Sequence, residues 1–217
     1  MASLFLFPIG LVAGVLAEAV AIDVAPPQVR KESRRLPIVV AATGLLFAAT
    51  PLVVDVTWVL PAYLWFVAVT VTLTLTDIDS QLIPNRILFP GTVVGVVLLL
   101  AGSLIEGGPL LRPLVGGFAY FGLLFVLALI ARGGFGYGDV KLGFLLGVFT
   151  AFVAWEILVV AVFTAFLLGG LISLVLIISR LRSRKDAIPF GPYLVVGSYV
   201  ALAWGSALAD WYRNGGG

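Results

Sequence analysis

Residues 57–86 read TWVLPAYLWFVAVTVTLTLTDIDSQLIPNR, an apolar run that ends abruptly in two carboxylates. The run from 57 to 76 has about the 20 residues that a helix needs to cross the hydrocarbon core of a bilayer. Asp77 follows it directly, and Asp79 comes two residues later. An ionisable side chain at membrane depth is costly and is usually retained for function, so Asp77 marks both the end of a span and a candidate site.

The rest of the chain also has the composition of a membrane protein. Of its 217 residues, 61% are hydrophobic and 11% are charged, and the mean hydropathy is +1.17, whereas a soluble domain has about 25% charged residues. The chain contains neither cysteine nor histidine. This excludes disulfides, Cys/His zinc sites and histidine-dependent triads, so acid–base chemistry must fall to carboxylates.

Apolar segments of similar length recur along the whole chain, and we predict an all-α polytopic membrane protein with about eight transmembrane helices. Proline residues such as Pro61, Pro84 and Pro90 are expected at the helix boundaries. The first segment lacks the basic start of a signal peptide and is expected to remain as a span. The junctions at 55–57 and 154–156 leave almost no loop, which fits either a hairpin or a kinked helix. The predicted spans are 4–24, 37–55, 57–76, 88–105, 113–131, 140–154, 156–179 and 190–212.

The positive charges give an orientation. Cytoplasmic loops of membrane proteins collect Lys and Arg, and here one set of alternate loops holds all of the 13 basic residues except Arg112 and Arg213. Both termini are therefore predicted on the non-cytoplasmic side, with Asp77 and Asp139 at cytoplasmic helix ends. The basic residues of the cytoplasmic set are Arg30, Lys31, Arg34, Arg35, Arg86, Arg132, Lys141, Arg180, Arg182, Arg184 and Lys185.

Asp139 follows Gly136-Tyr137-Gly138 and precedes another apolar segment. At a helix start, the free N–H groups and the helix dipole favour a carboxylate, so an ordinary N-cap is one interpretation. The two glycines leave a backbone without Cβ atoms that an extended chain can approach closely, so a peptide-binding site is the other. Lys141 is placed to tune Asp139 electrostatically, or it serves only the topology.

Asp77 lies at the C-terminal end of its span, where the helix dipole disfavours a negative charge. Two carboxylates that folding brings together share a proton, as in aspartic proteases. Our hypothesis is that Asp139 is the ionised base that activates water and Asp77 the protonated acid that polarises the scissile carbonyl. Asp79 is expected in the loop, solvated or paired with Arg86, as a supporting residue. Glu18, inside the first span, either belongs to the site or extends its carboxylate to the membrane surface.

Three motifs together resemble the type IV prepilin peptidases. The segment Gly136–Lys141 resembles the GxGD motif of that family, and residues 77–85 resemble its other catalytic-aspartate segment. Residues 188–193 are similar to the stretch before its last helix. The motifs occur in the family order, and the resemblance extends over roughly residues 60–210.

The resemblance implies an aspartic endopeptidase of the cell (inner) membrane. Such an enzyme removes the short basic leader of prepilins or pseudopilins, cutting after a glycine on the cytoplasmic face. The resemblance also divides the chain into an N-terminal helix pair (1–56), a peptidase core (57–212) and a tail (213–217). An acidic mouth that includes Asp79 would attract the leader; no nucleic-acid partner is expected. The implied residues are Asp77 and Asp139 as catalysts, Gly136, Gly138, Asp79 and Lys141 as supporting residues, and Pro84, Asn85, Pro189 and Gly191 for substrate binding.

One departure from the family bears on a second activity. Many bacterial members carry paired CxxC motifs in a long loop after the first helix, linked to N-methylation with S-adenosylmethionine. Here that loop shrinks to about residues 25–36, and the chain has no cysteine. We therefore predict a peptidase without a zinc site and without methyltransferase activity. S-adenosylmethionine would be needed only if that activity were retained, and no other cofactor is expected.

Two other classes of protein share some of these features. A lipid-phosphate enzyme would hold Mg²⁺ through Asp77, Asp79 and Asp139, but the sequence lacks the cluster of basic residues that grips a phosphate. An ion or proton transporter would use buried carboxylates near the middle of the membrane, whereas these acids lie at helix ends.

Overall fold

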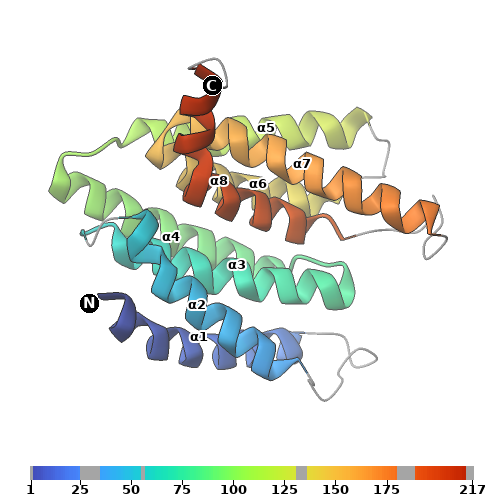
Figure 1. The fold of residues 1–217 in the computed structure, drawn as a ribbon, viewed down its shortest axis with the longest axis horizontal. Helices are drawn as coiled ribbons and strands as arrows, with labels where there is room; N and C mark the ends of the chain where they lie inside the picture. Colours follow the sequence, from blue (N-terminus) through green and yellow to red (C-terminus); the bar gives the residue numbers. More distant parts are fainter. Residues whose placement is uncertain (1, 25–34, 55–56, 131–135, 180–188, 214–217) are drawn as a thin grey trace. The chain divides into compact units, whose positions relative to one another are not determined.

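The computed structural model describes residues 2–24, 35–54, 57–130, 136–179 and 189–213. These residues form eight α-helices (Figure 1). Each helix coincides with a predicted span to within four residues at either end, which confirms the all-α class. The helices are α1 Ala2–Val24, α2 Leu36–Val53, α3 Leu60–Ser80, α4 Asn85–Glu106, α5 Leu111–Ile130, α6 Tyr137–Val153, α7 Trp155–Ile178 and α8 Gly191–Arg213.

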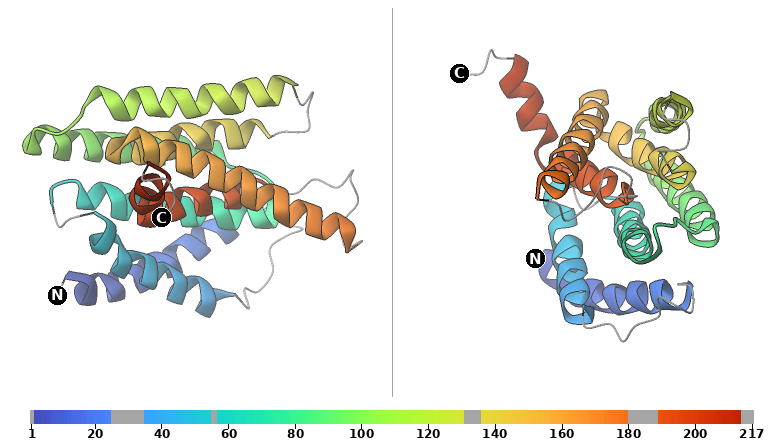
Figure 2. Two further views of the ribbon diagram at one scale, coloured as in Figure 1. Left: turned by 45° about the horizontal axis from the view of Figure 1, so that its top comes forward. Right: turned by 90° about the vertical axis from the view of Figure 1, so that its right-hand side faces the viewer.

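The helices group into two compact units, Met1–Leu110 and Leu111–Gly217. In the first unit, α1 packs along α2, both contact α3, and α3 pairs with α4. In the second unit, α5 packs along α6, α7 packs along α8, and α6 contacts both α7 and α8 (Figure 2). The functional division predicted at 56/57 stays a prediction.

The helices have the length and surface of membrane spans. Among the described residues, α1 to α5 and α7 are long and apolar enough to cross a bilayer, whereas α6 has only 17 residues. Large apolar side chains such as Val159, Phe163 and Leu174 of α7 are exposed. Lipid accommodates such a surface, and helices satisfy their own backbone groups within it. The protein is therefore a multi-pass membrane protein.

Glycines allow neighbouring helices within each unit to approach closely. A Cβ on Gly91 of α4 would lie 2.8 Å from a methyl group of Val69 on α3. A Cβ on Gly147 of α6 would lie 2.5 Å from the carbonyl oxygen of Gly116 on α5. Small residues at helix contacts are typical of membrane proteins, and they hold α3 and α6, the two helices that carry the candidate aspartates, against their neighbours.

Local hydrogen bonds move several helix ends away from their predicted positions. α3 continues to Ser80, one turn past the predicted end at 76, and the Gln81 N–H donates to the Asp77 carbonyl at 2.8 Å. Pro84 is the N-cap of α4, but Pro90, predicted at a boundary, lies inside that helix. Neighbouring groups in a membrane protein compensate for the single backbone bond that a proline removes.

The junction at 154–156 is a break between two helices. Ala154 is extended, with φ −166° and ψ 161°, and it separates α6 from α7. The kinked-helix alternative is therefore wrong at this position. The other short junction, at 55–56, lies outside the described residues, as do residues 25–34, 131–135, 180–188 and 214–217.

Candidate active site

Asp77 lies in the last turn of α3 and is buried, with only 4% of its surface exposed. The prediction of a carboxylate at the C-terminal end of a membrane helix is thus confirmed. Here the helix dipole opposes a negative charge.

Asp139 lies at the opposite kind of helix end, and it is 8% exposed. α6 begins at Tyr137, and Gly136 is its N-cap, so the N-cap interpretation of Asp139 is wrong. The Gly136 carbonyl accepts the N–H of Asp139 at 3.1 Å, which makes Asp139 the third helical residue. It nevertheless remains within the first turn, where the dipole favours an ionised carboxylate.

Gly136 gives the Asp139 carboxylate its space. A Cβ at position 136 would lie 3.0 Å from Oδ2 of Asp139, so the carboxylate bends back over the N-cap residue. Any larger residue at 136 would displace it. The first glycine of the motif therefore shapes the surroundings of Asp139 directly, and its role as a supporting residue stays a prediction.

Asp77 belongs to the first unit and Asp139 to the second. Each unit supplies one buried carboxylate at a helix end, one at the negative and one at the positive end of a helix dipole. The pairing of the two carboxylates stays a prediction.

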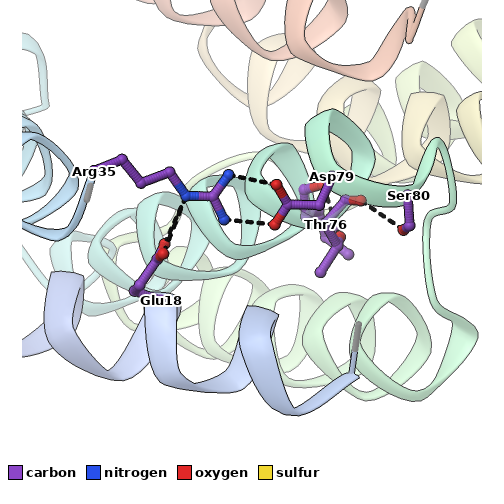
Figure 3. A network of polar contacts seen from close by, with 6 residues as sticks. Glu18, Arg35, Thr76, Asp79 and Ser80 are labelled. Atoms are coloured by element: carbon purple, nitrogen blue, oxygen red, sulfur yellow. Dashed lines mark hydrogen bonds and ion pairs between the residues drawn. The ribbon is translucent and has the colours of Figure 1, made fainter. Parts of the chain in front are cut away.

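Asp79 does not lie in the loop, and it does not pair with Arg86. It lies in the last turn of α3, where Oδ1 and Oδ2 accept hydrogen bonds from Nη1 and Nη2 of Arg35 at 2.6 and 2.5 Å. Figure 3 shows the guanidinium reaching from the start of α2 with its two nitrogens facing the two carboxylate oxygens. Such bidentate pairs fix the orientation of both groups.

Glu18 of α1 completes this network from the other side of Arg35. Nε of Arg35 donates to Oε1 and Oε2 of Glu18 at 3.0 and 3.2 Å, and Glu18 is only 1% exposed. The Glu18 carboxylate is therefore held within the protein, and whether it lies at the depth of the membrane surface stays a prediction. A buried carboxylate needs a cation, so Glu18 implied a basic partner, but the sequence did not show which one, and Arg35 was predicted only as a topology residue.

The network keeps Arg35 charged. Burial alone would lower the pKa of the Arg35 guanidinium, but the hydrogen bonds and charges of Asp79 and Glu18 together raise it above its ordinary value. Both acids consequently face a permanent cation at any pH at which the protein is studied.

The other predicted residues lie at three helix starts. Asn85 is the exposed first residue of α4, directly after the N-cap Pro84, and both follow Asp77 within the α3–α4 turn region. Gly191 is buried at the first position of α8, which packs against α6. Gly138 and Lys141 of α6 are half-buried, as is Pro189, which precedes α8. Of the last motif, Ile188 lies outside the described residues.

The contacts of Asp79 bear on the alternative of a magnesium site formed by Asp77, Asp79 and Asp139. Arg35 engages both oxygens of Asp79, so this carboxylate is not available to a cation. Among the described residues, no group of three acidic side chains is placed to hold a metal. Each unit thus offers one buried carboxylate, Asp77 or Asp139, for acid–base chemistry.

Comparison with known proteins identifies relatives over most of the chain. The profile of the type IV leader peptidase family matches residues 64–174. This match covers about half of the chain and includes both Asp77 and Asp139. No solved structure matches the chain at a significant level.

Three curated relatives carry the name prepilin leader peptidase/N-methyltransferase. The protein of Aeromonas hydrophila is 31% identical over 182 residues, covering 83% of this chain and 62% of the relative. That of Pseudomonas aeruginosa is 30% identical over 181 residues, with 82% and 61% covered. That of Bacillus subtilis is 32% identical over 177 residues, with 78% and 66% covered. The chain thus spans a little over three fifths of the length of these relatives.

Proposed function

The chain belongs to the type IV leader peptidase family, and from this premise we propose that it is a membrane-embedded aspartic endopeptidase acting on type IV prepilins or pilin-like precursors. The observation that carries the proposal is the family match across both Asp77 and Asp139. The burial of both carboxylates supports it. Neither the lipid-phosphate enzyme nor the transporter is favoured by the comparisons.

The two helix ends suggest how the acids divide the chemistry. Asp139, in the first turn of α6, accepts a proton from the attacking water. Asp77, in the last turn of α3, donates a hydrogen bond to the carbonyl oxygen of the scissile peptide and stabilises the charge that develops there. As the C–N bond breaks, Asp139 passes the proton that it took from water to the nitrogen of the leaving amine. Asp139 is then ionised again, and Asp77 still carries the one proton of the pair.

The proposed attraction of a basic leader needs a correction at Asp79. Because Arg35 neutralises this carboxylate, Asp79 does not act as a separate anionic contact for the leader. Glu18, Arg35 and Asp79 together still carry one net negative charge, so this end of the first unit keeps a weaker attraction for a cationic segment.

We further propose that the site faces the cytoplasm of the cell membrane and that cleavage proceeds without methylation. The distribution of Lys and Arg supports the orientation. The curated relatives are named for both activities. This chain has no cysteine and therefore lacks the CxxC motifs that are linked to methylation, which supports cleavage alone.

The test is cleavage of a candidate prepilin by the purified protein in liposomes. We expect Asp77→Asn and Asp139→Asn each to lower the rate at least about a hundredfold, the range seen on removing a general acid or base. Asp210→Asn, which alters an exposed carboxylate of α8, is the matched control and should cleave normally. Mass spectrometry of the product should show a free N-terminus even when S-adenosylmethionine is added.

Two results would contradict this proposal separately. Normal cleavage by either Asp77→Asn or Asp139→Asn would remove the aspartic mechanism. A product that carries the additional mass of a methyl group would leave the peptidase intact but would refute cleavage without methylation.

A further inference from the structure

The last turn of α3 carries Asp77 although its local sequence gives that turn little support. The Asp77 carbonyl accepts the Gln81 N–H at 2.8 Å and the Thr76 carbonyl accepts the Ser80 hydroxyl at 2.7 Å, but the carbonyls after Asp77 lie beyond the reach of the helical hydrogen-bond pattern. Two carboxylates, Asp77 and Asp79, stand at the negative end of the helix dipole. The helix ends on Gln81 at φ 54°, a conformation that a residue other than glycine rarely adopts. A turn of this kind frays unless contacts from outside hold it.

Arg35 provides such a contact. Its guanidinium holds Asp79 through two short hydrogen bonds and Glu18 through Nε (Figure 3). The network therefore joins α1, the start of α2 and the end of α3. Because Glu18 is fully buried, at least one of the two ion pairs is shielded from screening by salt.

Asp77 lies two residues before Asp79 in the same turn of α3. Residues two apart on a helix point to different faces, so the guanidinium that grips Asp79 holds one side of the turn while Asp77 projects from another. Arg35 can thus fix the backbone of the turn without occupying the surroundings of the Asp77 carboxylate. Its effect on Asp77 is one of position.

We propose that Arg35, anchored by Glu18 and acting through Asp79, is a positioning residue that holds Asp77 in its reactive place. The inference rests on the proposed function, since it assumes that Asp77 is catalytic. It also assigns a role to Asp79 that does not involve the substrate. A misplacement of about 1 Å in a reacting group can cost about a hundredfold in rate, so a clamp of this kind bears directly on turnover.

The test uses variants that leave no buried carboxylate without a cation. Removing Arg35 altogether would leave a buried carboxylate unpaired and endanger folding. Arg35→Lys retains the positive charge but loses the planar fork, and Asp79→Asn retains the shape of the side chain. In each variant we expect kcat to fall about tenfold or more. In Arg35→Lys, which keeps the net charge of the network, KM for the prepilin should change less than about twofold.

A second measurement reads the position of the turn without relying on activity. The chain has no cysteine, so a single nitroxide label can be attached at Ile78, which is 53% exposed in the last turn of α3. Val97 of α4, 60% exposed, is the control position. In the Arg35→Lys background, the label at 78 should become more mobile and the label at 97 should not.

The double variant tests whether the two residues act together. If Arg35 works through Asp79, adding Asp79→Asn to Arg35→Lys should lower kcat little further. The proposal would be overturned if the kcat losses of the two single variants multiplied in the double variant, or if kcat were unchanged in Arg35→Lys. An equal gain in label mobility at positions 78 and 97 would also overturn it. Failure of the proposed function would look different: the unmodified protein would not cleave prepilin at all, whereas the label would still report the clamp.

Discussion

Two aspartates in the same helical turn have different surroundings in this protein. Asp79 accepts two hydrogen bonds from Arg35, whereas Asp77 is only 4% exposed. Because a neutralised carboxylate is a poor acid–base catalyst, the ion pair separates the structural member of the Asp-x-Asp motif from the candidate catalyst. The difference between them arises from a contact with a residue 44 positions away in the chain.

Gln81 offers a test of how the end of α3 is held. Its φ of 54° is unfavourable for a residue with a Cβ, by roughly 1–2 kcal/mol. Gln81→Gly should raise the free energy of unfolding by about 0.5 kcal/mol, because part of the relief is offset by the greater freedom of glycine in the unfolded chain. Gln81→Val, a β-branched residue, should lower it. Thermal unfolding in detergent micelles measures both, and a glycine variant that melts below the valine variant would contradict the assignment.

Residue identity alone was enough to select Asp77 and Asp139, because acids at the ends of apolar segments are rare and costly. It was not enough to place them exactly. The sequence offered Asp139 as an N-cap, but Gly136 takes that position, and Asp79 was expected in the loop. Such details depend on one or two hydrogen bonds at a helix end. Arg35 could not be recognised because its partners lie in two other helices.

At the scale of the helices, close packing by glycine determines where the candidate acids are held. Gly116 and Gly117 of α5 lie against α6, and a Cβ on Gly117 would lie 2.7 Å from a methyl group of Val148. These contacts bring two helix backbones together over several turns. The position of Asp139 at the start of α6 therefore depends on the fit of α5 along that helix.

Gly147→Ala tests this dependence. The added Cβ would lie 2.5 Å from the Gly116 carbonyl oxygen, so α5 and α6 must separate, and we expect the free energy of unfolding to fall by about 2 kcal/mol. The matched control is Gly122→Ala on α5, where a Cβ meets nothing within 4 Å. There alanine should stabilise the helix by up to about 1 kcal/mol.

The readouts are thermal unfolding and prepilin cleavage measured on the same samples. Gly147→Ala should lower both, since α6 carries Asp139, whereas Gly122→Ala should lower neither. Equal stability of the two variants would mean that the α5–α6 contact is more adaptable than these distances indicate.

The existence of the helices could be predicted, but their ends could not be predicted exactly. Apolar runs of about 20 residues have few alternatives to a helix in lipid, which is why all eight segments were found. The ends depend on local events, such as the left-handed residue at 81 and the tolerance of Pro90 within α4. A proline or glycine indicates that a helix end is near, but it does not show whether that residue lies inside the helix or outside it.

At the scale of the whole molecule, the amino-acid composition identifies a membrane protein, and the distribution of positive charge predicts its orientation in the membrane. Each of the two units contributes helices with exposed apolar side chains, which only a lipid environment accommodates. Arg35 shows that one basic residue can serve two purposes. It belongs to the set of basic residues from which the orientation of the chain is predicted, and it also neutralises Asp79 within the first unit.

The orientation makes a prediction for two positions that lie at successive helix connections. Leu82, between α3 and α4, and Leu110, between α4 and α5, are both exposed. In the absence of native cysteine, Leu82→Cys and Leu110→Cys can each be probed alone. A membrane-impermeant maleimide added to right-side-out vesicles should label position 110 and should label position 82 only after permeabilisation. The expected pattern follows from the excess of Lys and Arg on the side of residue 82. Inverted vesicles are the control and should reverse the labelling pattern.

Labelling of position 82 from outside would place Asp77 on the non-cytoplasmic side, where the leader of a precursor still anchored by its cytoplasmic end would be out of reach.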